Sequence, residues 1–223
     1  MRGVIVTVMN FRDSLADYGV LPVVTAHSVH GTVRLAQALA EAGMGAIEIT
    51  LRTDCAAESI RAVRDAVPGI TVAAGTVCAP RDLQVAMAAG AAFCVSPGLT
   101  PTLLQAAADN GMALLPGIAS ASDIMLGLEH GLDVFKFFPA GAAGGVGMLK
   151  ALAGPFPQVA FCPTGGLTAD NFREYLALPN VLCCGGSWMV ASALVQQEQW
   201  DMIKQLAAEA IATSAARATG DIT

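Results

Sequence analysis

Residues 46–75 read AIEITLRTDCAAESIRAVRDAVPGITVAAG and follow the pattern of a strand, a helix and a second strand. Ala46–Leu51 alternates Ile and Leu with smaller or polar residues, which is the period of a strand. Ala56–Val67 is a longer Ala-rich run, and Gly69 follows it where glycine favours the end of a helix. Ile70–Ala74 is apolar and predicts a second, buried strand.

This unit recurs about eight times along the chain. Strands are expected at Leu21–Thr25, Ala46–Leu51, Ile70–Ala74, Ala92–Ser96, Ala113–Leu115, Val134–Phe138, Val159–Cys162 and Val181–Cys184. Helices are expected at Thr32–Ala42, Ala56–Val67, Pro80–Ala89, Pro101–Asn110, Ala121–His130, Val146–Ala153, Ala169–Leu178 and Ala191–Ala215. The alternation predicts an α/β fold, a single (β/α)₈ TIM barrel; eight units of similar length favour it over a doubly wound open sheet.

The first 20 residues are expected to form an N-terminal helical extension, with an extra helix around Arg12–Asp17, and residues 21–223 one barrel domain. The apolar stretch Gly3–Met9 is short and no small-residue cleavage site follows it, so we do not expect a signal peptide. No apolar run reaches the roughly 18 residues that span a membrane, so no membrane partner is expected.

Composition restricts the partners further. The chain is 54% hydrophobic and 13% charged, with a formal net charge of −6. No basic run is present, which argues against nucleic acid as a partner. An anionic ligand would have to be held by local groups rather than by the overall field.

The sulfur and imidazole side chains do not suggest a metal centre. Six cysteines include no CxxC pair and are expected to be small buried hydrophobes in a reduced cytoplasm. The three histidines form no ligand pattern with a nearby carboxylate pair, so neither a metal nor another cofactor is expected.

Lys136 is one of only three lysines and lies in Val134–Pro139, a run that otherwise predicts a buried strand. Burial disfavours the charged ammonium, and the neutral amine is a nucleophile that forms Schiff bases with carbonyl compounds. The alternative is a structural lysine whose stem packs on the phenylalanines while its head reaches water.

Two further charged residues are expected inside the barrel. With period two, Glu48, Thr50 and Arg52 share the inward face of their strand, and Lys136 points into the same interior. The alternative is a buried ion pair that fixes the core. Thr76, at the exit of the next strand, could donate a hydrogen bond to a ligand carboxylate or simply cap a turn, and Pro97 lies in a rigid turn beside the pocket.

Gly165 and Gly166 follow the seventh expected strand, and Gly186 and Ser187 follow the eighth. Backbone N–H groups of glycine loops can cradle phosphate, and barrels hold phosphate after these two strands. Ser187 is also expected to cap a short helix. Lys136 as nucleophile, Glu48 as proton shuttle and a phosphate site together indicate Schiff-base lyase chemistry on a phosphorylated 2-keto acid or sugar.

The order of these motifs closely resembles the 2-keto-3-deoxy-6-phosphogluconate (KDPG) and 4-hydroxy-2-oxoglutarate (KHG) aldolase family. The resemblance runs from about Val20 to Trp188. It is carried by the segments Glu48–Thr53, Ala74–Val77, Ser96–Gly98, Phe135–Ala140, Phe161–Gly166 and Gly185–Trp188.

The resemblance implies a class I aldolase of the Entner–Doudoroff pathway: a cytoplasmic homotrimer that cleaves KDPG to pyruvate and D-glyceraldehyde 3-phosphate without a cofactor. Activity in this family often extends to KHG, which yields pyruvate and glyoxylate. Lys136 would form the imine and Glu48 would be the acid/base. Pyruvate would contact Lys136, Arg52, Thr76, Pro97 and Phe138, and phosphate would contact Gly165, Gly166, Gly186 and Ser187.

Three alternatives remain open from the residues. The nearest is an aldolase for the galactonate epimer, because the contacts that read C4 stereochemistry are not evident from the sequence. A barrel epimerase or isomerase would share the phosphate loops but would not need an imine-forming lysine. A non-enzymatic sugar-phosphate-binding barrel would not need both Lys136 and Glu48.

Overall fold

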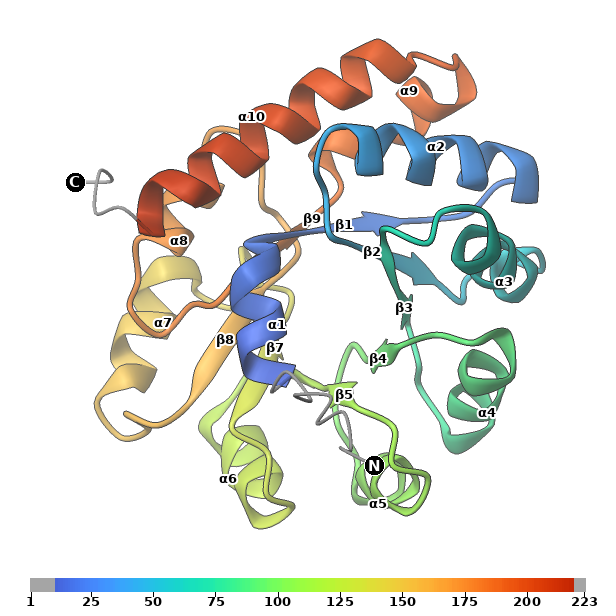
Figure 1. The fold of residues 1–223 in the computed structure, drawn as a ribbon. Coiled ribbons are helices and arrows are strands. Elements are labelled where there is room, and N and C mark those ends of the chain that lie inside the picture. The colour runs from blue at the N-terminus through green and yellow to red at the C-terminus, as the bar shows by residue number, and fades with distance from the viewer. Residues whose placement is uncertain (1–10, 219–223) are drawn as a thin grey trace, which may run out of the picture.

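The computed structural model describes residues 11–218. Its strands are all paired in parallel and are β1 (Val20–Val24), β2 (Ala46–Thr50), β3 (Thr71–Gly75), β4 (Phe93–Val95), β5 (Leu114–Leu115), β6 (Gly117–Ile118), β7 (Val134–Phe137), β8 (Ala160–Pro163) and β9 (Cys184–Gly186). They form a six-stranded sheet in the order β5-β4-β3-β2-β1-β9 and a three-stranded sheet in the order β6-β7-β8. The result is an α/β fold with a curled parallel sheet (Figure 1).

The two sheets approach each other at both edges. On one side, isolated bridges join Phe161 to Val181 and Thr164 to Gly185, which connects β8 to the β9 region. On the other side, Pro116 alone separates β5 from β6, and its carbonyl accepts a 2.9 Å hydrogen bond from Lys136 N. The strand predicted to stop at Leu115 therefore resumes beyond a proline, which cannot donate to the ladder.

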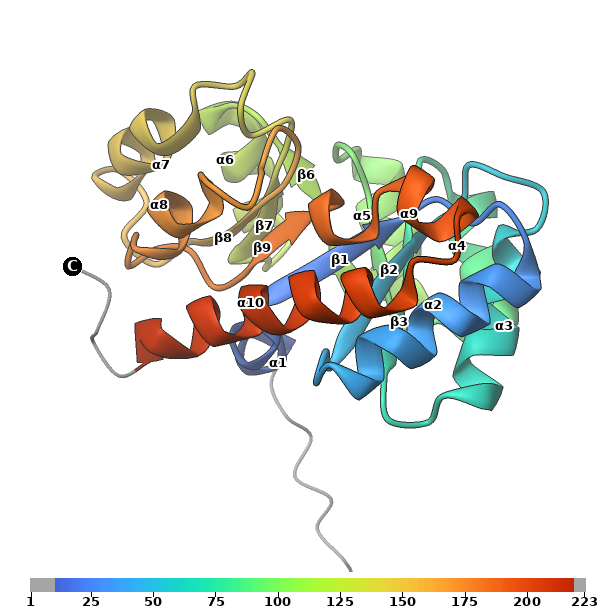
Figure 2. The ribbon, with the colours of Figure 1, turned by 90° about the horizontal axis from the view of Figure 1, so that it is seen from above.

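The helices, with the exception of the first, lie on the outer side of the strands (Figures 1 and 2). They are α1 (Phe11–Tyr18), α2 (Val29–Glu41), α3 (Ala56–Ala66), α4 (Pro80–Ala89), α5 (Pro101–Asp109), α6 (Ala121–Glu129), α7 (Gly145–Ala153), α8 (Phe172–Leu176), α9 (Ser192–Gln196) and α10 (Trp200–Ala218), with a 3₁₀ turn at Trp188–Val190. No helix in the described part of the chain is long and apolar enough to cross a membrane.

Several sequence-based boundaries were wrong, and three of the differences change the course of the chain. The single helix expected over Ala191–Ala215 is broken into α9 and α10, because Glu198 takes a left-handed conformation with φ 52°. Helix α8 is shorter than the predicted Ala169–Leu178, because a turn at 168–171 precedes it. The last strand lies at Cys184–Gly186 rather than Val181–Cys184, and it pairs there with β1.

The strands alternate between two apolar clusters, as their period predicts. Ile47 and Ile49 of β2 pack in the larger cluster, on the helix side. Ala46 of β2 and Val134 of β7 belong to the smaller cluster, which fills the interior between the strands. This alternation places Glu48 and Lys136 on the inner side.

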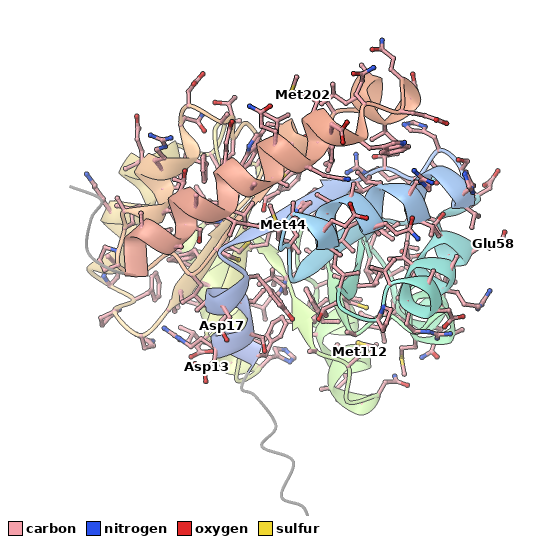
Figure 3. The ribbon with its side chains drawn as sticks, turned by 45° about the horizontal axis from the view of Figure 1, so that its top comes forward. Asp13, Asp17, Met44, Glu58, Met112 and Met202 are labelled. Atoms are coloured by element: carbon pink, nitrogen blue, oxygen red, sulfur yellow. The ribbon has the colours of Figure 1, made fainter. Side chains whose placement is uncertain are left out.

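Helix α1 closes the amino end of this interior. It includes the helix expected around Arg12–Asp17, and Leu15 is fully buried in the inner cluster. Asp13 and Asp17 lie on its exposed side (Figure 3). The stretch Gly3–Met9 lies outside the described residues, and strand β1 already begins at Val20, one residue before the expected boundary.

The cysteines follow the buried-hydrophobe prediction only in part. Four of them, Cys94, Cys162, Cys183 and Cys184, are buried. Burial raises the pKa of the Cys94 thiol to about 12, so this thiol stays protonated at neutral pH. Cys55 is half-buried, and the prediction was wrong for Cys78, which is exposed in the loop after β3.

Candidate active site

The predicted site residues gather at the carboxyl ends of the strands, where α/β barrels carry their chemistry. Glu48 lies on β2 and Lys136 on β7, whereas the others lie at or just beyond strand ends. These others are Arg52, Thr76, Pro97, Phe138, Gly165, Gly166, Gly186 and Ser187.

Lys136 and Glu48 form a buried ion pair. Lys136 Nζ lies 3.2 Å from Glu48 Oε1 and 3.4 Å from Oε2. Their side chains are 7% and 1% exposed. The snorkelling interpretation of Lys136 is therefore wrong, because its amine faces a carboxylate inside the protein. A buried carboxylate touching a buried amine is a suitable arrangement for moving protons to and from that amine.

Arg52 lies near the same end of the strands but is not part of this pair. It follows the last residue of β2 and is exposed, so the expectation that it lies inside the barrel is wrong. Its Nε donates a 3.2 Å hydrogen bond to Thr76 Oγ1. Arg52 forms no ion pair with any carboxylate in residues 11–218. The remaining guanidinium donors can therefore serve a ligand carboxylate, for which this group is well matched.

Thr76 adopts a left-handed backbone conformation with φ 60°. Such a conformation costs a β-branched residue about 1–3 kcal/mol and is found mainly where the surrounding structure imposes it, often at functional sites. The conformation holds the Thr76 hydroxyl at the Arg52 side chain.

Phe138 connects the lysine to the first glycine loop. Its ring centroid lies 5.3 Å from Lys136 Nζ. On the loop side, a Cβ at Gly165 would lie 3.1 Å from Phe138 Cε2. Gly165 and Gly166 have φ values of 93° and 81°, in the left-handed region that favours glycine.

Backbone and side-chain donors hold this glycine loop in place. Gly141 N donates to Gly165 O at 2.9 Å, and Asn171 Nδ2 donates to Gly166 O at 3.1 Å. Sequence reasoning missed Asn171. A sequence signal was present, because Thr168 and Asn171 are three residues apart just before a helix. In the structure the backbone N–H of each residue donates to the side chain of the other, a reciprocal pattern typical of helix starts.

The second glycine loop lies beside the first through the Thr164–Gly185 bridge. Ser187 and Arg52 line one cavity of about 350 Å³, together with Thr25 and Ser192. Ser187 precedes the 3₁₀ turn, but its side chain makes no capping hydrogen bond, so the expected capping role is wrong.

Pro97 occupies the turn after β4, where Ser96 Oγ donates to Gly98 O at 2.6 Å. The Pro97 carbonyl lies against Gly117, which pairs with Lys136 in the β6–β7 register. Pro97 thus borders the strand next to the lysine. Within residues 11–218, no three His, Cys, Asp or Glu side chains are grouped in a way that could hold a metal ion.

Comparison with known proteins identifies the family of this chain. A model of the aldolase family described as "KDPG and KHG aldolase" matches residues 12–206. A 2-dehydro-3-deoxy-phosphogluconate aldolase from Dickeya dadantii is 48% identical over 197 residues, covering 88% of this chain and 92% of the relative. A KHG/KDPG aldolase from Escherichia coli K12 is 49% identical over 192 residues, covering 86% of this chain and 90% of the relative.

The similarity extends to solved structures. The KDPG aldolase of Legionella pneumophila, with pyruvate captured as a covalent carbinolamine intermediate, has a TM-score of 0.86 and 43% sequence identity. The match covers 88% of this chain and 96% of that one. The chain described here belongs to the KDPG and KHG aldolase family.

Proposed function

We propose that this protein is a class I aldolase that cleaves KDPG to pyruvate and D-glyceraldehyde 3-phosphate, with KHG as a second substrate giving pyruvate and glyoxylate. The observation that carries the proposal is the buried Lys136–Glu48 pair, with Nζ 3.2 Å from Oε1. A carbinolamine, as captured in the Legionella relative, forms when an amine adds to a carbonyl group, and Lys136 is the buried amine at this site.

The first steps build the imine. Glu48 accepts a proton from the Lys136 ammonium, and the neutral amine adds to the C2 ketone. Glu48 then returns the proton to the carbinolamine hydroxyl, which leaves as water. The resulting protonated imine withdraws electrons from C3.

The carbon–carbon bond breaks next. Glu48, through a water molecule, removes the proton of the C4 hydroxyl, and the C3–C4 electron pair moves toward the imine. Glyceraldehyde 3-phosphate leaves, C3 of the enamine is protonated, and hydrolysis releases pyruvate and regenerates Lys136.

The ends of the substrate are assigned to different groups. Arg52 and Thr76, joined by a 3.2 Å hydrogen bond, bind the carboxylate, while Pro97 and Phe138 border the pyruvate moiety. The backbone of Gly165, Gly166 and Gly186, with the Ser187 hydroxyl, binds the phosphate. Support comes from the adjacency of the two loops and from the cavity that Arg52 shares with Ser187.

The architecture can be assigned more finely on the same basis. The proposed barrel is a closed (β/α)₈ unit, in which β5 and β6 are two halves of one strand and β8 meets β9; the bridges and the Pro116 hydrogen bond support closure. Residues 21–223 form one domain behind the helical extension. A cytoplasmic homotrimer is the assembly expected from the family resemblance.

Borohydride trapping with pyruvate, followed by peptide mass mapping, tests the reaction class. A reduced pyruvyl adduct on Lys136, absent without pyruvate, is the expected result. Absence of an adduct in folded protein would overturn the Schiff-base assignment. Turnover of KDPG measured against its galactonate epimer then decides the C4 preference, with faster cleavage of KDPG expected.

A further inference from the structure

Glu48 reaches Lys136 only because the neighbouring strand leaves room for its side chain. Strands β2 and β3 lie side by side, with Glu48 opposite Ala73 and Thr50 opposite Gly75 (Figure 1). Ala73 belongs to the inner cluster, so Gly75, two residues further along, faces the same interior. The Glu48 side chain leans along the strand direction and lies over Gly75.

The contact at Gly75 involves the reacting end of Glu48. A Cβ at position 75 would lie 2.7 Å from Glu48 Cγ and 2.8 Å from Glu48 Cδ, and it would also collide with Oε1. Separations below 3.0 Å require one of the groups to move. Oε1 is the oxygen that lies 3.2 Å from Lys136 Nζ, so the group that a Cβ at position 75 would displace is the one that pairs with the amine.

Backbone conformation does not explain the glycine. The φ angle of Gly75 lies outside the left-handed region, so alanine can adopt the same backbone. Glycine in a strand interior costs conformational entropy and buries no side chain, and it often marks close approach of another group. Here the approaching group is the Glu48 carboxylate.

We propose that Gly75 is a positioning residue for the Glu48 carboxylate. The absence of a side chain at position 75 sets the Glu48–Lys136 distance and thereby the rate of proton transfer at the imine and enamine. This inference rests on the proposed role of Glu48.

The test is a double-mutant cycle of Gly75→Ala and Glu48→Ala. The readouts are hydrogen–deuterium exchange at the pyruvate methyl group, borohydride trapping on Lys136, and thermal unfolding. Gly75→Ala in the wild-type background should slow exchange by about 100-fold, the range of a lost general acid–base group. Added to Glu48→Ala, it should slow exchange less than about twofold, because the displaced group is already gone.

Thermal unfolding keeps the test decisive if Gly75→Ala is unstable. Removing the Glu48 carboxylate makes room for the new Cβ, so the double variant should unfold at the temperature of Glu48→Ala alone. Gly69→Ala is the matched control: Gly69 precedes the other end of β3, away from the site, a Cβ there meets nothing within 4 Å, and wild-type exchange is expected.

Other outcomes would overturn the inference. One is wild-type exchange in Gly75→Ala. Another is that Gly75→Ala slows exchange equally in the wild-type and Glu48→Ala proteins. The third is a double variant that fails to fold while Glu48→Ala folds. Failure of the proposed function is recognised separately: Glu48→Ala alone would then keep wild-type exchange, or wild-type protein would give no adduct on Lys136.

Discussion

Two lysine–glutamate pairs in this protein have the same chemistry and different surroundings. Lys136 and Glu48 lie 3.2 Å apart with side chains 7% and 1% exposed. Lys204 of α10 and Glu41 of α2 lie closer, at 2.6 Å, but their side chains are 38% and 62% exposed. By distance alone the Lys204–Glu41 pair would be the stronger one. Water screens that exposed pair, however, whereas Lys136 and Glu48 have lost their contact with water and interact mainly with each other.

Burial changes what an ion pair can do. At the surface, each charged group keeps its hydration and the pair joins two helices with little consequence. Inside the protein, the carboxylate and the amine are each other's main polar partner, so a proton can pass between them. Neither can be removed without leaving the other uncompensated.

The largest expected effect comes from removing the buried lysine. Lys136→Ala should abolish turnover, because no amine remains to form the imine, while binding of a phosphorylated ligand largely survives. Steady-state cleavage and ligand titration measure the two properties. Lys204→Ala is the matched control and should retain wild-type turnover. Activity of Lys136→Ala within tenfold of wild type would remove the lysine from the mechanism.

The second effect concerns the two glutamates. Glu48→Gln should slow proton exchange at the pyruvate methyl group by about 10²-fold or more, because the amide cannot accept the proton. Pyruvate binding should change far less. Exchange followed by NMR measures this, with Glu41→Gln as the exposed counterpart at wild-type rate. Unchanged exchange in Glu48→Gln would break the functional contrast between the pairs.

A third prediction concerns Arg52, a cation that has no carboxylate partner in the described part of the chain. Arg52→Gln should raise the KM for KDPG by about tenfold or more, since a charge-assisted hydrogen bond contributes about 1.5–3 kcal/mol. Arg34→Gln, which removes a guanidinium 5.9 Å from the Trp200 ring, serves as control and should leave KM unchanged. An unchanged KM in Arg52→Gln would assign the carboxylate to other groups.

The smallest effect is expected at the exposed pair. The hydrogen bond from Lys204, and then its charge, lower the pKa of Glu41 below its usual 4.5, while the hydrogen bond to Glu41 raises the pKa of Lys204 above its usual 10.5. A lowered carboxyl pKa adds stability above its unfolded value that is lost as pH falls through the folded value. The raised lysine pKa adds stability that is lost at high pH.

Thermal unfolding between pH 3 and pH 8 checks this sign. Glu41→Gln should lower the unfolding temperature slightly at neutral pH, and the difference from wild type should shrink toward pH 3 and in high salt. A difference that grows on acidification would contradict the assignment.

Much of the site was predictable because strand periodicity fixes the face of the sheet to which each side chain points. Glu48 and Lys136 were expected in one interior, and they form a hydrogen-bonded pair there. Their direct pairing could not be predicted, because Arg52 was an equally suitable partner for Glu48 from the sequence. In the structure Arg52 lies beyond the end of β2, where its Nε donates to Thr76 Oγ1 instead.

The βα repeat, the inner and outer faces of the strands, and the types of chemical group at their carboxyl ends could all be predicted from the sequence. These follow from local periodicity and from the residue types that turns and helix ends require. Tertiary structure decided the direct contact of Lys136 with Glu48 and the space over Gly75 that Glu48 occupies. Each of these depends on atoms that the chain brings together from separate segments, and no local pattern encodes such distances.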